Sequence, residues 1–179
     1  MRSAKNYLGA SIILLTILFA TVLPVIGGAN EPMSADTYKA HPFFIIGETK
    51  SFSSVPLGYS PSQIKSFYNL PQTGGSGTIA IIDAFYSPTI QNDLTVFCNQ
   101  FNLPSASLEI HNMSSTISVD SGWALETSLD VEWAHAIAPN AHILLVEATS
   151  DELSDLFNAV SYAAGRSDVT SISMSWGLP

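Results

Sequence analysis

The chain has 179 residues, of which 46% are hydrophobic and 12% charged, and its formal net charge is −9 at pH 7. This hydrophobic content is sufficient for a folded core and excludes general disorder. Only six residues are Lys or Arg, which argues against nucleic acid as a partner. The single cysteine, Cys98, excludes an internal disulfide framework and a cysteine-based metal site, so we expect it to be a buried structural thiol.

Residues 1–29 have the features of an export signal. Arg2 and Lys5 form a positive start, residues 8–26 are almost wholly apolar, and small residues end the segment at Ala29. The apolar run is also long enough to be an uncleaved membrane anchor, the only membrane contact that we predict. Either alternative places the rest of the chain outside the cytoplasm, so we expect a secreted or extracellular protein.

Residues 30–57 show no clear periodicity and are predicted to be a linker arm, whereas residues 58–179 alternate between helical and strand patterns. Helices are predicted over 60–68, 87–101, 121–138 and 149–165, and strands over 78–83, 107–111, 141–147 and 169–176. We expect Ser87 to cap the second helix, and Thr149 with Glu152 to form a capping box at the fourth. The alternation predicts an α/β fold, a parallel sheet with helices on both faces.

The helix over 121–138, which Pro139 ends, carries two carboxylates where they serve no structural purpose. Its predicted core stripe consists of Leu125, Leu129, Trp133 and Ala136, and its predicted polar face of Thr127, Ser128, Glu132 and His135. Glu126 and Asp130 lie four residues apart beside the stripe, where like charges destabilise a helix by a few tenths of a kcal/mol, on the order of 0.2–0.5. The structural alternative is a solvated acidic face.

Coupled carboxylates share protons, and one of them takes up a proton at a raised pKa. Such a pair can accept the proton of a nucleophile, as the histidine of a hydrolase triad does, with an optimum moved to acid pH. A metal site is the other chemical use, but His135 is expected on the far side of the helix and His142 in the next strand, so we predict none.

Asp83 and the Trp176–Gly177 pair end predicted strands, where ligand sites of parallel sheets lie. For Asp83 the alternative is a loop or capping carboxylate. The glycine run over 74–77 precedes its strand, and this position excludes a dinucleotide-binding fingerprint.

The run G-W-A-L-E-T-S-L-D-V-E-W-A-H-A-I-A-P-N-A, followed by a hydrophobic strand and S-I-S-M-S-W-G, resembles the sedolisin (serine-carboxyl peptidase) family. The match covers about residues 58–179 and includes Y-S-P-S-Q-I-K-S-F-Y-N-L-P and T-I-A-I-I-D. The resemblance implies a subtilisin-like fold and a serine-type endopeptidase that cleaves polypeptides at acid pH.

By this resemblance Glu126 is the general base for a catalytic serine and Asp130 is its hydrogen-bonding partner. Asp83 takes the place of a glutamate that extends the proton network in some members, and Trp176 is a further candidate for that network. Ser175, Trp176 and Gly177 match the segment that lines the substrate cleft and pairs with the peptide backbone.

This sequence departs from the family pattern in that it contains neither the G-T-S nucleophile motif nor the oxyanion-stabilising aspartate that follow the S-W-G strand. The family's calcium site belongs to the same C-terminal part, so the predicted domain is incomplete at its C-terminus and no cofactor is expected in this chain. We therefore expect residues 1–179 alone to be inactive.

Two other interpretations remain open. One is a catalytically inactive remnant that binds peptides through an exposed sheet edge. The other is an ordinary subtilisin relative, which needs a histidine near the position of Glu126.

Overall fold

The computed structural model describes residues 38–42 and 58–178, all of which belong to the unit Ser34–Pro179. The predicted export segment and most of the predicted linker arm lie outside the described residues. Among the described residues, no helix combines the length and the apolar character that crossing a membrane requires.

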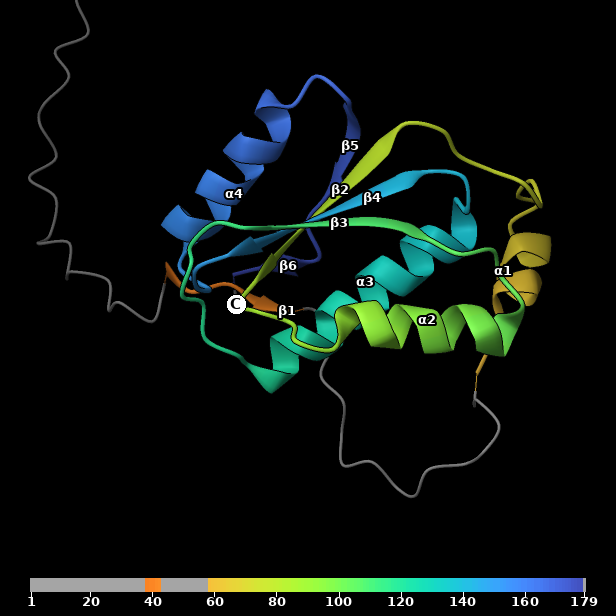
Figure 1. The fold of residues 1–179 in the computed structure, drawn as a ribbon, viewed down its shortest axis with the longest axis horizontal. Helices are drawn as coiled ribbons and strands as arrows, with labels where there is room; N and C mark the ends of the chain where they lie inside the picture. The colour runs from red at the N-terminus through yellow and green to blue at the C-terminus, as the bar shows by residue number, and fades with distance from the viewer. Residues whose placement is uncertain (1–37, 43–57, 179) are drawn as a thin grey trace, which may run out of the picture. The chain divides into compact units, whose positions relative to one another are not determined.

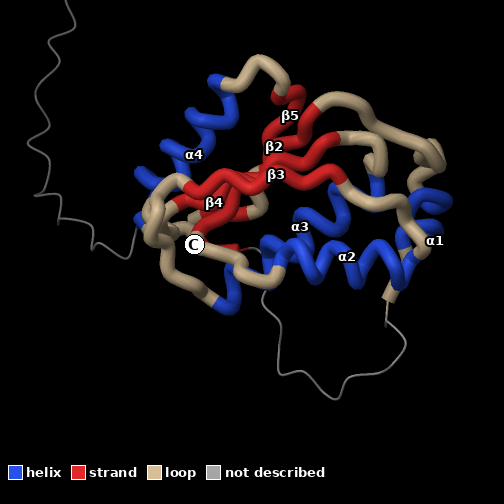
Figure 2. Tube along the Cα trace, in the orientation of Figure 1, coloured by secondary structure: helices blue, strands red, loops and turns tan. Residues whose placement is uncertain are grey.

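A four-stranded parallel sheet forms the centre of the fold (Figures 1 and 2). Its strands are β2 (Thr78–Ala84), β3 (Ser107–Asn112), β4 (His142–Ala148) and β5 (Val169–Ser173), in the order β3-β4-β2-β5. The helices are α1 (Pro61–Phe67), α2 (Ile90–Phe101), α3 (Ser121–Ile137) and α4 (Leu153–Gly165). The predicted α/β architecture with a parallel sheet is confirmed.

Alternate residues of the two central strands enter two separate cores, which confirms that helices cover both faces. On one face, Ile81 of β2 and Leu145 of β4 pack with Ile90 and Leu94 of α2 and Val131 of α3. On the other face, Ile82 and Val146 pack with Leu156, Ala159 and Ala163 of α4. Because strand residues alternate between faces, Asp83 and Glu147 belong to the α2–α3 face.

The crossover through α3 has the opposite hand to the other two. The chain moves along the sheet in opposite directions from β2 to β3 and from β3 to β4, yet α2 and α3 lie on the same face. The β4-to-β5 crossover moves in the same direction as β3-to-β4 but passes over the other face. Since such crossovers are right-handed in about 98% of cases, α3 is the helix of the exceptional left-handed one.

The predicted stripe of α3 was right for Ala136, which is fully buried, but wrong for the rest of the buried face. Leu125 is 36% exposed, and Leu129 and Trp133 are only partly buried. The residues that α3 buries are Trp123, Glu126, Thr127, Val131, His135 and Ala136. The prediction failed because it assumed that the polar positions face water, whereas this helix turns several of them toward the sheet.

Three boundaries also differ from prediction. Helix α2 begins at Ile90, and its N-cap Thr89 makes no side-chain capping bond, so the predicted cap at Ser87 was wrong. The N-cap of α4, Glu152, likewise makes no side-chain capping bond, so the predicted capping box was wrong. The predicted last strand breaks after Ser173 and resumes as the short strand β6 (Trp176–Gly177).

Part of the predicted linker arm pairs with the domain. Strand β1 (His41–Pro42) pairs antiparallel with β6, His41 opposite Gly177 and Pro42 opposite Trp176. Ala40 is fully buried, and its N–H donates to the carbonyl of Asp151 at 2.8 Å. The described part of the arm therefore belongs to the packed structure, while Phe43 and Phe44 lie outside the described residues.

A candidate carboxylate site at the carboxyl ends of the strands

Two carboxylates lie side by side in the sheet where strands β2 and β4 end. Asp83 and Glu147 are register partners of the parallel ladder, and both are fully buried. Neighbouring strands are about 4.8 Å apart, and both side chains leave the sheet on the α2–α3 face. The predicted location of Asp83 at a strand end is confirmed, but it is a core residue and not a loop or capping carboxylate.

Helix α3 presents two further carboxylates, those of Glu126 and Asp130, to this end of the sheet. Asp120 begins the helix by accepting from the N–H groups of Gly122 and Trp123, at 2.9 and 3.0 Å. Nearly two turns further on, Glu126 is only 2% exposed, and Asp130 is partly buried. Four residues correspond to just over one turn, so both side chains occupy one face of the helix.

The pKa of Asp83 shows that these carboxylates act on one another. Burial raises this pKa well above its usual range, and the charges of Asp130 and Glu126 raise it further. Both Asp83 oxygens are buried without a well-formed hydrogen bond to any described residue, although the Thr127 hydroxyl opposes part of the rise. Burial of a carboxylate disfavours its charged form, so the protonated form of Asp83 is favoured.

Asp130 contacts the S-W-G segment, which is the other part of the predicted site. Burial raises the pKa of Asp130, and a hydrogen bond from the Ser175 side chain opposes this rise. Ser175 lies in the break between β5 and β6, two residues beyond the last ladder position of β5. The fold thus brings Asp83, Glu126, Asp130 and Ser175 together from three separate segments.

Trp176 and Gly177 lie near this cluster but use their polar groups elsewhere. The indole Nε1 of Trp176 donates to the carbonyl of Ile82 at 2.8 Å, directly before Asp83. Gly177 pairs with His41 of β1. The Trp176 side chain therefore stabilises the end of β2. The backbone of Trp176 and Gly177, which was predicted to pair with a substrate peptide, pairs with the chain's own residues 41–42.

Sequence reasoning missed Glu147 and Ser87. The Ser87 N–H donates to Glu147 Oε1 at 2.8 Å in a buried position, and burial raises the pKa of Glu147 to about 7. The sequence did contain a signal, because the two central strands have similar ends. In each, an apolar run ends with an acidic residue, as in I-I-D and L-V-E. Pairing those two strands in register would have placed the acids together.

The two histidines considered as metal ligands lie outside the cluster that contains Asp83, Glu126 and Asp130. His135 is fully buried, which corrects its predicted polar position, and its Nε2 lies 2.8 Å from the carbonyl of Pro104. His142 is at the start of β4, and its ring contacts Ser107 and Glu109. Within residues 38–42 and 58–178, no three His, Cys, Asp or Glu side chains are grouped so as to hold a metal ion.

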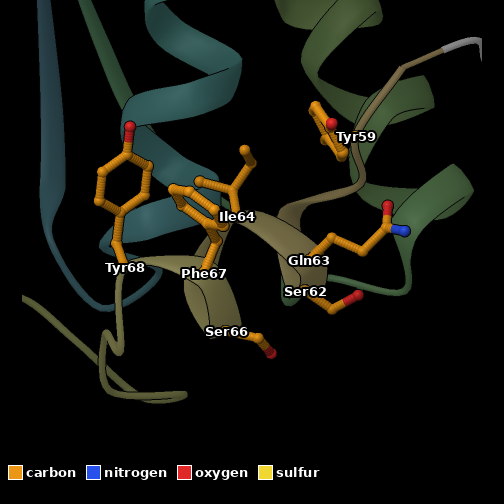
Figure 3. A pocket seen from close by; sticks show the side chains of 7 residues that line it. All are labelled: Tyr59, Ser62, Gln63, Ile64, Ser66, Phe67 and Tyr68. Atoms are coloured by element: carbon orange, nitrogen blue, oxygen red, sulfur yellow. The ribbon is translucent and has the colours of Figure 1, made fainter.

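A separate hollow of about 790 Å³ lies beside α1 (Figure 3). Its lining consists of Tyr59, Ser62, Gln63, Ile64, Ser66, Phe67 and Tyr68, and contains no Asp, Glu, Lys, Arg or His. The chain passes from α1 to the amino end of β2, whereas the carboxylates lie at its carboxyl end. Seven strand residues span about 20 Å, so the hollow is not part of the carboxylate site.

Comparison with known proteins gives a likeness in structure. No protein-family model matches this chain, and no curated protein matches its sequence. The fold is similar to that of a Pseudomonas sedolisin, a serine-carboxyl proteinase solved in complex with two molecules of pseudo-iodotyrostatin. The TM-score is 0.56 at 20% sequence identity, and the match covers 64% of this chain and 34% of that chain.

This likeness supports a subtilisin-like fold. The chain matches about a third of the length of the sedolisin, so it corresponds to one part of that protein. At this level of identity the chemistry has to be argued from the residues of the carboxylate site.

Proposed function

We propose that this chain carries the general base of a serine-type endopeptidase that works at acid pH. The observation that carries the proposal is the position of Glu126 and Asp130. Both lie on one face of α3, in a cluster with buried Asp83 at the carboxyl ends of the parallel strands. This is where ligand sites of parallel sheets form.

In the proposed reaction Glu126 accepts the hydroxyl proton of a serine as that oxygen attacks the peptide carbonyl carbon. Glu126 then gives the proton to the leaving amine, as the histidine of a triad does. Asp130 orients Glu126 and holds its proton in place. The serine and the donors that stabilise the oxyanion would come from residues outside this sequence, as would any calcium site of the kind expected from the family.

The cluster accounts for an acid optimum. Four buried or partly buried carboxyl groups, Asp83, Glu126, Asp130 and Glu147, cannot all ionise close together. At acid pH most of them are neutral, and Glu126 can then lose and regain a proton without the repulsion of charged neighbours. At neutral pH the accumulated negative charge would repel both the cluster's own groups and the oxyanion of the transition state.

The test is cleavage of unfolded protein at about pH 4 by the complete protein in which residues 1–179 occur. Glu126→Gln is expected to lower kcat by about 10³-fold or more, and Asp130→Asn to lower it by at least about 10-fold. The matched control is Glu132→Gln, on the same helix but outside the cluster. Residues 1–179 alone are expected to cleave nothing, and full activity of the complete Glu126→Gln protein would refute the proposal.

A second candidate function is a non-catalytic module that binds extended peptides. The observation that favours it is β6, which already pairs antiparallel with an extended segment of the chain, His41–Pro42. Main-chain pairing of this kind does not depend on the carboxylates. If this candidate holds, the complete protein binds unfolded peptides without cleaving them, and Glu126→Gln leaves their affinity unchanged.

A further inference from the structure

Glu147 has no role in the proposed proton transfer, yet it lies inside the carboxylate site. Its side chain is fully buried, Oε1 accepts from the Ser87 N–H, and Oε2 has no hydrogen-bond partner among the described residues. Ser87 itself is 2% exposed. A fully buried acid that uses one oxygen for a backbone bond and leaves the other unbonded calls for an explanation.

Glu147 fixes the turn that follows Asp83. Phe85 adopts a left-handed conformation, with φ 66°, which is uncommon for a residue with a bulky side chain. Its N–H donates to the carbonyl of Ala148 at 2.9 Å, and the next N–H, of Tyr86, donates to the carbonyl of Ser118 at 2.9 Å. The bond from Ser87 to Glu147 is the third in this series and the only one made to a side chain.

The groups that face Glu147 are acidic or neutral. Its register neighbours are Asp83 on β2 and Asn112 on β3, and Glu126 and Asp130 of α3 act on Asp83. The other acids nearby are engaged elsewhere: Asp93 of α2 accepts from the Thr89 and Ser128 hydroxyls, and Asp120 caps α3. Among the described residues, no Lys, Arg or His forms an ion pair with Asp83 or Glu147.

We propose that Glu147 is a positioning residue of the carboxylate site, which anchors the turn after Asp83 and shares a proton with Asp83. The Asp83–Glu147 pair binds one proton more than two ionised carboxylates would. This proton is carried by either Glu147 or Asp83. This extra proton keeps the end of β2 compatible with an ionised Glu126. The inference rests on the proposed function for its catalytic meaning, but the coupling itself is measurable without activity.

The experiment follows the side-chain carboxyl NMR signals of the full chain, isotopically labelled at aspartate, as a function of pH. The Asp83 signal is assigned by its loss in Asp83→Asn. In Glu147→Gln the amide oxygen still accepts from Ser87, so the turn is kept while one like charge is removed. The expected result is a fall in the midpoint of Asp83, with unchanged hydrogen-exchange protection of the Ser87 amide.

Glu132→Gln is the matched control, because burial also raises the pKa of Glu132 to about 7 but its acidic neighbour is Asp93. This variant should leave the Asp83 midpoint in place. The reciprocal variant, Asp83→Asn in a glutamate-labelled chain, should lower the Glu147 midpoint by a similar amount. It also serves if Glu147→Gln fails to fold.

The inference is overturned if neither variant moves the partner's midpoint, or if Glu132→Gln moves Asp83 as far as Glu147→Gln does. Because the readout is titration, these outcomes are independent of the cleavage assay. Loss of the coupling would refute this inference alone, and unimpaired cleavage by Glu126→Gln would refute the proposed function alone.

Discussion

The Trp176 indole and the Ile82 carbonyl are joined by a 2.8 Å hydrogen bond across 94 positions of sequence. This bond ties the S-W-G segment to the strand that delivers Asp83. It explains how a short strand with little ladder pairing of its own keeps a fixed place beside the carboxylates.

Trp176→Phe should therefore weaken the fold. The substitution keeps an aromatic ring but leaves the Ile82 carbonyl without this donor, which costs about 1–2 kcal/mol of unfolding free energy. Trp133→Phe is the control, because Trp133 packs edge-on against Phe97 and forms no hydrogen bond with a described residue through its indole. Urea unfolding of both variants provides the measurement, and equal losses would contradict the role assigned to the Trp176 bond.

Because of the buried acids, we predict that the free energy of unfolding falls as the pH rises. Burial raises the pKa values of Glu132 and Glu147 to about 7, so between about pH 4.5 and about pH 7 the folded chain binds more protons than the unfolded chain. Their stabilising contribution is complete below the unfolded pKa and is lost as the pH passes through the folded pKa. For fully buried Glu147 the loss is about 3 kcal/mol.

Urea unfolding at about pH 4.5, 6 and 7.5 checks this dependence. The ion pair of Arg166 with Asp168, which lowers the pKa of Asp168 to about 2, acts below this range and does not disturb it. Stability that stays constant or increases over the range would show that the acids are better solvated than their burial indicates.

Gly77→Ala should be among the most damaging small substitutions in the chain. Gly77 has φ +88°, and an added Cβ would lie 2.6 Å from Thr170 Cγ2 and 2.9 Å from its Oγ1. The same hydroxyl donates to the Thr78 carbonyl at 2.9 Å, so Thr170 cannot move away freely. We expect a loss of about 2–3 kcal/mol, from backbone strain and from overpacking.

Gly165→Ala is the matched control for that substitution. Gly165 is the last residue of α4, and an added Cβ there would meet nothing within 4 Å. Helix propensity predicts that this variant is as stable as the parent or gains up to about 1 kcal/mol. Thermal unfolding of both variants checks the contrast, which would fail if both lost similar stability.

His135 in α3 and His142 at the start of β4 should respond very differently to substitution by alanine. Since a carbonyl can only accept, His135 Nε2 must carry a proton for Pro104, and His135→Ala removes both this bond and a fully buried ring. The expected loss is about 2–4 kcal/mol. His142→Ala removes a half-exposed ring and should cost less than about 1 kcal/mol, so a comparable effect on urea unfolding would contradict the assigned burial.

Sequence patterns were sufficient to predict the order and type of the elements from α1 to β5. The central strands are continuous apolar runs, and the turn residues that separate them from the helices are unambiguous. The resemblance also singled out Glu126 and Asp130, which the fold places in one cluster with Asp83. The role of each in catalysis remains a prediction.

The orientation of α3 was beyond sequence reasoning because its polar residues do not separate cleanly from its apolar ones. Thr127 is buried and donates to the Trp123 carbonyl within its own helix, while Leu125 faces outward. Glu147 was missed for a related reason. A carboxylate at the end of an apolar strand is normally expected to be solvated, and only the register of β2 with β4 shows that it is enclosed.

The pairing of the central strands also constrains how the chain folds. Thr78 opens a strand whose two neighbours begin at His142 and Val169, so β2 has no partner until most of the domain has been synthesised. Long separations of this kind slow folding, because loop closure costs entropy before any sheet contact forms. A newly synthesised β2, which is apolar on both faces, would therefore remain unpaired until its neighbours are made. We expect refolding to be slow, with aggregation at high protein concentration.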